Sequence, residues 1–255
     1  MWRRLFFAGL FAALLLRPLA LYAEPFILES GPDRVTLLEL YTSEGCSSCP
    51  PAEEWMTGLR SSHDLWKKLV PVAFHVDYWN DLGWKDALSE QAYSNLQRAH
   101  ARRWGSSSVY TPMFVKNGKE FRTWFTEPGV PRTWRKKTGM LTVEKLSDGQ
   151  WRARYQPQPS MRLAGDFNVH AALLGFDIRS KVAAGENRGR ELVHDFAVLD
   201  MRNSRLTLAG HNFEAMLPLG RAPAVAGQRM GLAVWVTGAD DEMLQAVGGY
   251  LPEEK

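Results

Sequence analysis

The N-terminal half alternates between strand-like and helix-like hydrophobic patterns. Arg34–Thr42 and Lys68–Asn80 are nearly continuous apolar runs, the pattern of strands that are buried on both faces. Between them, Pro50 and Pro51 are tolerated only in the first turn of a helix. We therefore predict a helix that starts at about Ser48 or earlier.

The segment after the second apolar run contains another predicted helix and a hairpin. The helix runs from about Leu88 to Trp104, with Ser89 as its N-cap and Gly105 just beyond its end. Farther along, two short β-prone runs flank Asn117-Gly118, the strongest short-range signal for a hairpin. Strands that alternate with helices predict a mixed, largely parallel α/β sheet.

The periodicity of the pattern changes to two after Met140. The preceding segment, Thr126–Gly139, holds two prolines, two glycines and a cationic run, and it is interpreted as a linker. Beyond it, short alternating or apolar runs are separated by Gly, Pro, Asn and Asp, as in an all-β sandwich. The predicted organisation is an α/β domain at about 30–138 and an all-β sandwich-like module at about 139–250.

The first 23 residues form a distinct segment. Two arginines precede an apolar run from Leu5 to Leu16, and the small residue Ala23 follows, which is the pattern of a secretory signal peptide. The run is shorter than the 20 or so residues that span a bilayer. We therefore expect a periplasmic or secreted protein without stable membrane insertion. An uncleaved N-terminal anchor is the alternative, because Leu21 is large for the third position before a cleavage site after Ala23.

Charge does not favour a nucleic-acid partner. The chain has 31 lysines and arginines against 28 aspartates and glutamates, and three of the arginines lie in residues 1–23. Removal of this segment would leave no net charge, so the excess of basic residues belongs to the targeting segment. A basic patch for nucleic acid is not predicted.

The only two cysteines are Cys46 and Cys49, in the stretch SEGCSSCPPAEEW. Disulfides persist outside the cytoplasm, but a disulfide that closes a loop of only four residues stabilises the fold by only about 2 kcal/mol. A C-x-x-C pair at a helix start therefore favours redox chemistry over stapling. No second cysteine pair completes a four-thiolate zinc site, and we assign no metal ligands.

The chain resembles a known family in four blocks. The strand that leads into C-x-x-C at a helix start, together with VYTPMFVKNGKEF, is similar to thioredoxins. LLELYTSEGCSSCPPAEEW, HVDYWNDLGWKD, VYTPMFV and GENRGRELVHDFAV closely resemble exported bacterial thioredoxin-like proteins catalogued as domain of unknown function 1223. The resemblance implies a thioredoxin-like domain with an appended β-rich module, and it implies no particular substrate.

The resemblance implies roles for the motif residues. Cys46, at the helix N-terminus, would be the nucleophile, because the helix dipole stabilises a thiolate, and Cys49 would resolve the mixed disulfide. Ser47 and Ser48 would either donate to the thiolate or simply cap the helix. An inert local disulfide is the alternative for the pair. Pro112, if cis, would bring the Thr111 backbone beside Cys46 to pair with a substrate strand.

Three further residues are candidates for tuning the thiols. Glu39 lies seven residues ahead of Cys46, near the position of a buried acid that aids proton transfer in thioredoxins, but one residue farther from the first cysteine. Because a shift of one residue along a strand changes the face, Glu39 would either aid proton transfer or pair with a cation or backbone group in the core. His75 and Asp77 alternate and would share a face if the strand continued. Such a pair would either tune the thiolate or act as general base, or it would hold the following loop.

The predicted function is thiol–disulfide exchange with exported protein thiols or disulfides and an unknown redox partner, with no cofactor beyond the Cys46–Cys49 disulfide. The first alternative is Cu(I) binding by Cys46 and Cys49, with Met113 or His75, because soft thiolates and thioethers suit that ion. The second alternative is a non-catalytic binding module. The charged turn Glu186–Arg190 is either a solvated surface or a docking surface against the first domain.

Overall fold

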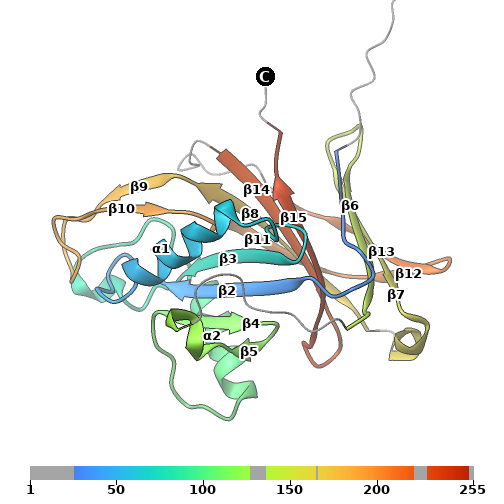
Figure 1. The fold of residues 1–255 in the computed structure, drawn as a ribbon, viewed down its shortest axis with the longest axis horizontal. Coiled ribbons are helices and arrows are strands. Elements are labelled where there is room, and N and C mark those ends of the chain that lie inside the picture. Colours follow the sequence, from blue (N-terminus) through green and yellow to red (C-terminus); the bar gives the residue numbers. More distant parts are fainter. Residues whose placement is uncertain (1–25, 127–135, 165, 221–228, 253–255) are drawn as a thin grey trace, which may run out of the picture.

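The computed structural model describes residues 26–126, 136–164, 166–220 and 229–252, and its fold is built mainly of β-strands (Figure 1). The predicted signal peptide and most of the predicted linker lie outside the described residues. The strands are β1 (Ile27–Glu29), β2 (Thr36–Thr42), β3 (Leu69–His75), β4 (Met113–Lys116), β5 (Lys119–Glu120), β6 (Gly139–Lys145), β7 (Trp151–Pro157), β8 (Asn168–Phe176), β9 (Ile178–Lys181), β10 (Glu191–His194), β11 (Ala197–Arg205), β12 (Thr207–Ala209), β13 (Asn212–Leu217), β14 (Arg229–Thr237) and β15 (Met243–Tyr250). The helices are α1 (Pro50–Gly58) and α2 (Gln91–Arg103), with 3-10 turns at Leu59–Ser61, Asn80–Leu82, Arg122–Phe125 and Pro159–Ala164.

Eight strands form one mixed sheet in the order β15-β14-β8-β11-β3-β2-β4-β5. β2 and β3 are parallel along their whole length, and all seven residues of each are buried. β11 pairs with β3 in parallel at Ala197 and Ala73, and it continues antiparallel to β8. Strands from the C-terminal half therefore extend the sheet that carries the N-terminal strands (Figure 1).

The predicted fold class is wrong. A thioredoxin-like α/β domain followed by an all-β sandwich-like module was expected, but the described residues contain only two α-helices, and the large sheet joins strands from both segments. The short apolar runs of the C-terminal half were correctly read as strands. Periodicity, however, does not say which strands pair, because a buried strand satisfies its backbone groups equally well against any partner.

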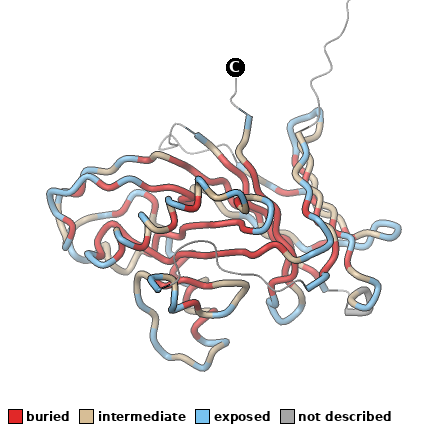
Figure 2. Tube along the Cα trace, in the orientation of Figure 1, coloured by how far each residue is buried: buried red, intermediate tan, exposed pale blue. Residues whose placement is uncertain are grey.

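β2, β3 and most of β8 in the large sheet are buried on both faces. A second sheet has the strand order β1-β6-β7-β13-β12. Val169 and Leu173 of β8 face this sheet, while Leu174 faces the core that also holds Met56 and Phe74. This alternation follows from the two-residue repeat of a strand. The strands of the large sheet are accordingly the most buried part of the chain (Figure 2).

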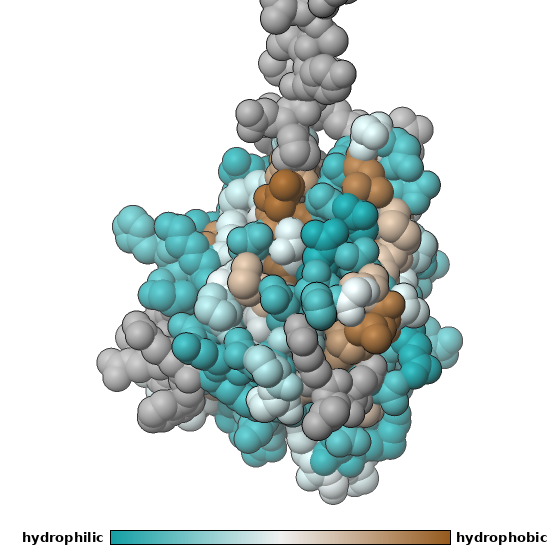
Figure 3. Space-filling view, turned by 90° about the vertical axis from the view of Figure 1, so that its right-hand side faces the viewer, coloured by the Kyte–Doolittle hydropathy of each residue, from teal (hydrophilic) through white to brown (hydrophobic). Residues whose placement is uncertain are grey.

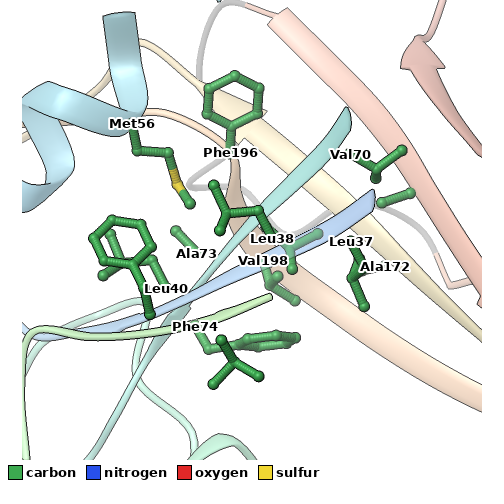
Figure 4. Close-up of a cluster of buried hydrophobic side chains, with 14 of the residues drawn as sticks. Leu37, Leu38, Leu40, Met56, Val70, Ala73, Phe74, Ala172, Phe196 and Val198 are labelled. Carbon is green, nitrogen blue, oxygen red and sulfur yellow. The ribbon is translucent and has the colours of Figure 1, made fainter. Parts of the chain in front are cut away.

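The core under α1 is built by residues that are distant in sequence. Met56 of α1 and Phe196 lie over the sheet, and Phe74 lies on the opposite face from its neighbour Ala73 (Figure 4). Leu38 of β2 and Val198 of β11 belong to the same hydrophobic cluster. α1 is thus fixed against the sheet partly by side chains from the C-terminal half.

The outer surface gives no sign of a large apolar patch on the side that carries the five-stranded sheet. That face is mostly hydrophilic with separate apolar side chains (Figure 3). The five-stranded sheet carries the exposed apolar residues Ile27, Leu208 and Met216. Single exposed apolar residues are normal on folded proteins. None of the helices in the described ranges has the length and apolar character that crossing a membrane takes.

Most local predictions are confirmed, with shifted ends. α1 begins at Pro50 with Cys49 as its N-cap, and α2 begins at Gln91 rather than near Leu88. β4 and β5 form the predicted hairpin, in which Asn117 and Gly118 have φ of 50° and 78°. β3 ends at His75, well before Asn80.

Candidate functional site

The loop between β2 and α1 carries both cysteines. Cys46 and Cys49 are free thiols with exposures of 1% and 0%, and Cys49 caps α1. The carbonyl of Cys49 accepts hydrogen bonds from the backbone N–H of Ala52 and Glu53. Pro50 lies at the helix start because its missing N–H is not needed there.

The two thiols have opposite electrostatic environments. Hydrogen bonding with Cys49, together with Ser48 and the Thr111 side chain, lowers the pKa of Cys46 to about 6, although burial opposes the shift. The Cys46 Sγ lies 3.2 Å from Ser48 Oγ and 3.8 Å from the Thr111 carbonyl oxygen. Burial, and then Cys46 itself, raises the pKa of Cys49 well above its usual value. The pair therefore combines one easily ionised thiol with one that keeps its proton.

Thr111 is held beside the thiols by the loop after β3. The Thr111–Pro112 peptide bond is cis, as the resemblance implied. The Trp79 indole N–H donates to Thr111 Oγ1 at 2.8 Å, and the chain at Gly45 passes so close to Trp79 that an added Cβ would lie 2.9 Å from its Cβ. A glycine at position 45 is thus needed for the close approach of these loops.

The turn between β9 and β10 clamps the cysteine loop. Asn187 is buried, and its side-chain amide donates to the carbonyls of Glu44 at 2.9 Å and Cys46 at 2.8 Å. Glu186 accepts from the backbone N–H and the hydroxyl of Ser47, at 2.9 and 2.7 Å. Both predictions for Glu186–Arg190 hold in part, since Asn187 and Glu186 contact the N-terminal segment while the charged residues of the turn are exposed.

A buried charge cluster lies behind the cysteine loop. His194 of β10 bonds to Glu53 Oε2 through Nδ1 at 2.5 Å and to Glu44 Oε1 through Nε2 at 3.1 Å. Burial alone would lower the pKa of His194, but the carboxylates of Glu53 and Glu44 raise it to about 10. Thr42 connects the cluster to the thiols, because its hydroxyl donates to Glu53 at 2.5 Å and hydrogen-bonds with Cys49.

His75 takes part in the same region with a partner that differs from the predicted one. Its Nδ1 lies 2.7 Å from Asp86 Oδ2, and both side chains are fully buried. Burial opposes ionisation of Asp86, but the charge of His75 and its hydrogen bond lower the pKa of Asp86 to about 2. The backbone N–H of Glu44 donates to the same Asp86 oxygen at 3.0 Å.

Other predicted residues have different partners. Asp77 lies beyond the end of β3 and bonds to Ser94 of α2, so the predicted His75–Asp77 pair is wrong. Glu39 pairs with His100 at 3.1 Å on the strand face opposite Thr42, which the alternation of strand side chains requires. Ser47 bonds to Glu186 and not to sulfur.

The soft sulfur of Met113 also has a partner of its own. It accepts a hydrogen bond from the Gln97 amide at 3.9 Å. The residue is buried at the start of β4, next to the cis proline. Nothing in this contact directs the thioether to the thiols.

Sequence reasoning missed most of the charge cluster. No role in a site was predicted for Glu44, Glu53, Asp86 or His194. The signal lay in the quoted blocks, since SEGC, PPAEEW, LGWKD and ELVHD hold these residues. No short-range pattern connects segments that are more than a hundred residues apart.

Comparisons with known proteins agree on the fold and give no activity. The model of a family described as "Protein of unknown function (DUF1223)" matches residues 37–237. A crystal structure of a protein from Agrobacterium tumefaciens is similar, with a TM-score of 0.58 and 20% identity over 88% of this chain and 98% of that chain. HBP35 of Porphyromonas gingivalis has a TM-score of 0.56 and 13% identity, over 89% and 80% of the two chains. Among curated proteins, no relative matches the sequence.

Proposed function

The chain belongs to the DUF1223 family, and from this premise and its dithiol we propose that it is an exported thiol–disulfide oxidoreductase that acts on other exported proteins. The observation that carries the proposal is the asymmetry of the pair: the pKa of Cys46 is lowered to about 6, while that of Cys49 is raised. Since only a thiolate attacks a disulfide, Cys46 is the residue suited to start the exchange at neutral pH.

The exchange proceeds in two balanced steps. The Cys46 thiolate attacks one sulfur of a partner disulfide, which forms a mixed disulfide and releases the other partner sulfur as a thiolate. Cys49 then attacks Cys46 Sγ, the internal disulfide forms, and the second partner sulfur leaves with the proton of Cys49. The partner is reduced and the pair is oxidised, and the reverse sequence oxidises a partner dithiol.

The rim of the thiol site suits an extended partner segment. Ser47 and Ser48 are exposed, and Thr111 and Pro112 are half-buried next to Cys46. A partner disulfide would approach Cys46 between Ser48 and Thr111, because the thiol itself is covered. Export by the N-terminal segment is part of the proposal, and the N-terminus of the mature protein would then be Glu24.

Trapping of the mixed disulfide tests the proposal. The Cys49→Ser variant removes the resolving thiol, so incubation with a disulfide-bonded peptide is expected to accumulate a covalent adduct, which mass spectrometry detects as the mass of one peptide chain. The Cys46→Ser variant is the matched control and is expected to form no adduct, because the thiol of Cys49 stays protonated.

Two results would overturn the proposal. One is the absence of an adduct with Cys49→Ser although the protein is folded by circular dichroism. The other is equal adduct formation by Cys46→Ser, which would show that thiol reactivity does not depend on the asymmetry of the pair.

A further inference from the structure

One buried nitrogen near the charge cluster has no partner. The Nε2 of His75 lacks a hydrogen bond in the part of the chain that the structure describes, although the side chain is fully buried. The other ring nitrogen, Nδ1, is taken by Asp86. A buried polar atom without a partner costs about 1–3 kcal/mol, so this nitrogen calls for a ligand.

Two further metal-ligating side chains gather around this histidine. One ligand atom from each of Glu53, His75 and His194 lies within 4.8 Å of the others. The His75 and His194 rings meet edge to face, with centroids 4.8 Å apart. Since Asp86 holds Nδ1 of His75, Nε2 is the nitrogen that this histidine offers.

The cluster also carries the negative charge that suits a cation. Glu44, Glu53 and Asp86 are three nearly buried carboxylates that surround two imidazoles. Buried charges without compensation are unfavourable. A divalent ion would offset two of the three negative charges and would give His75 Nε2 a partner.

We propose that Glu53, His75 and His194 form a binding site for a divalent transition-metal ion of the Zn²⁺ type. Two imidazoles and one carboxylate are a donor set that zinc accepts, with a fourth position left for water. Asp86 would orient His75 from the outer side, as carboxylates do for metal-bound histidines. The ion would replace the proton through which His194 now bonds to Glu53.

The ligand atoms already lie near the spacing that the ion needs. Bond lengths of about 2.0–2.2 Å place donors roughly 3.4 Å apart around a tetrahedral zinc ion, so the ligand atoms need to shift only modestly. Glu53 also lines a surface pocket of about 240 Å³ between α1 and β10, together with Glu54, Glu191 and Arg190. Glu53 is therefore the ligand on the solvent side of the site.

The site is separate from the thiols and goes beyond the proposed exchange. It uses no sulfur ligand, and it therefore differs from the Cu(I) site that the sequence suggested through Cys46 and Cys49. Thr42, which bonds to Glu53 and to Cys49, lies between them. Metal binding and disulfide exchange are consequently tested by different variants.

The test uses full-length protein in which both thiols are replaced, Cys46→Ser with Cys49→Ser. After treatment with a chelator, the protein is titrated with Zn²⁺ in competition with a chromophoric chelator. We expect one equivalent to bind, and His75→Gln in this background to weaken binding at least 100-fold. His100→Gln is the matched control, because His100 is also buried and paired with a carboxylate, Glu39, and it should leave the affinity within threefold.

A second measurement does not depend on variants of the site. Co²⁺ bound to the thiol-free protein should give visible d–d bands of a nitrogen and oxygen site, and Zn²⁺ should raise the melting temperature as ligands of the native state do. Failure of the thiol-free protein to bind Zn²⁺ overturns the proposal, as does binding that appears only when Cys46 and Cys49 are present. Equal weakening by His100→Gln would also overturn it.

Discussion

At the scale of single residues, two adjacent serines in the motif have different tasks. Ser48 Oγ lies 3.2 Å from the sulfur of Cys46, whereas the Ser47 hydroxyl donates to Glu186. Both side chains are exposed and of the same type, so the sequence alone assigns them the same role. The direction of each side chain decides which one stabilises a thiolate.

This difference predicts unequal effects on the titration of Cys46. Its alkylation rate in wild type should rise with pH around a midpoint of about 6, because the thiolate is the reactive form. Ser48→Ala removes a hydrogen bond to a charged group, worth about 1.5–3 kcal/mol, and should raise the midpoint by roughly one pH unit or more. The measurement is the pH profile of iodoacetamide alkylation of Cys46, which mass spectrometry distinguishes from alkylation of Cys49.

Ser47→Ala is the control for this experiment, since its hydroxyl does not contact sulfur. Its midpoint should stay close to that of the parent. If both serine variants shifted the midpoint equally, the hydrogen bond of Ser48 would not be the cause.

At the scale of elements, the turn between β9 and β10 holds the cysteine loop in place. Asn187 supplies two hydrogen bonds to carbonyls of that loop, and Arg190 in turn donates to Asn187 Oδ1 at 2.8 Å. The turn and the loop are separated by about 140 residues. Their contact therefore depends on β11, which brings the preceding hairpin to the edge of β3.

Asn187→Ala should destabilise the protein by about 2–4 kcal/mol, because it leaves the buried Glu44 carbonyl without a donor and takes one of two donors from the Cys46 carbonyl, which keeps the Cys49 N–H. Chemical denaturation measures the free energy of unfolding. The exposed neighbour Arg188 serves as the control, and Arg188→Ala should change it by less than about 0.5 kcal/mol. A loss of similar size in both variants would mean that the turn, rather than the buried amide, is responsible.

At the scale of the whole molecule, the large sheet makes the two halves of the chain interdependent. β8, β11, β14 and β15 follow residue 138, yet they complete the sheet of β2 and β3. Side chains from these strands, including Ala172, Val198 and Trp235, belong to the same hydrophobic core cluster as Met56 of α1. A chain that stops at residue 138 would expose this core and the edge of β3.

We therefore expect the fragment 24–138 to lack a cooperative unfolding transition, whereas the chain from residue 24 to 255 should unfold in a single transition. Circular dichroism during heating and denaturant titration measures both. A folded fragment, or two separate transitions in the longer chain, would contradict the interdependence of the two halves.

The sequence by itself determined the local elements, because their signals are local. The continuous apolar run gave the buried strand β2, Asn117-Gly118 gave the hairpin turn, and the two prolines gave the start of α1 to within about two residues. It also indicated that His75 would need a carboxylate. Strand alternation pointed to Asp77 as this carboxylate, but the alternation ends together with the strand at His75.

Only the tertiary structure decided which distant groups meet. Pairing of β11 with β3 brings His194 to Glu44, Glu53 and His75, and it makes one sheet of what periodicity had divided into a thioredoxin-like domain and a β module. The physical reason is that strand periodicity fixes which face is apolar but not which strand lies alongside. Charge compensation in a buried cluster likewise depends on distances in space, and these are set by the register of the strands.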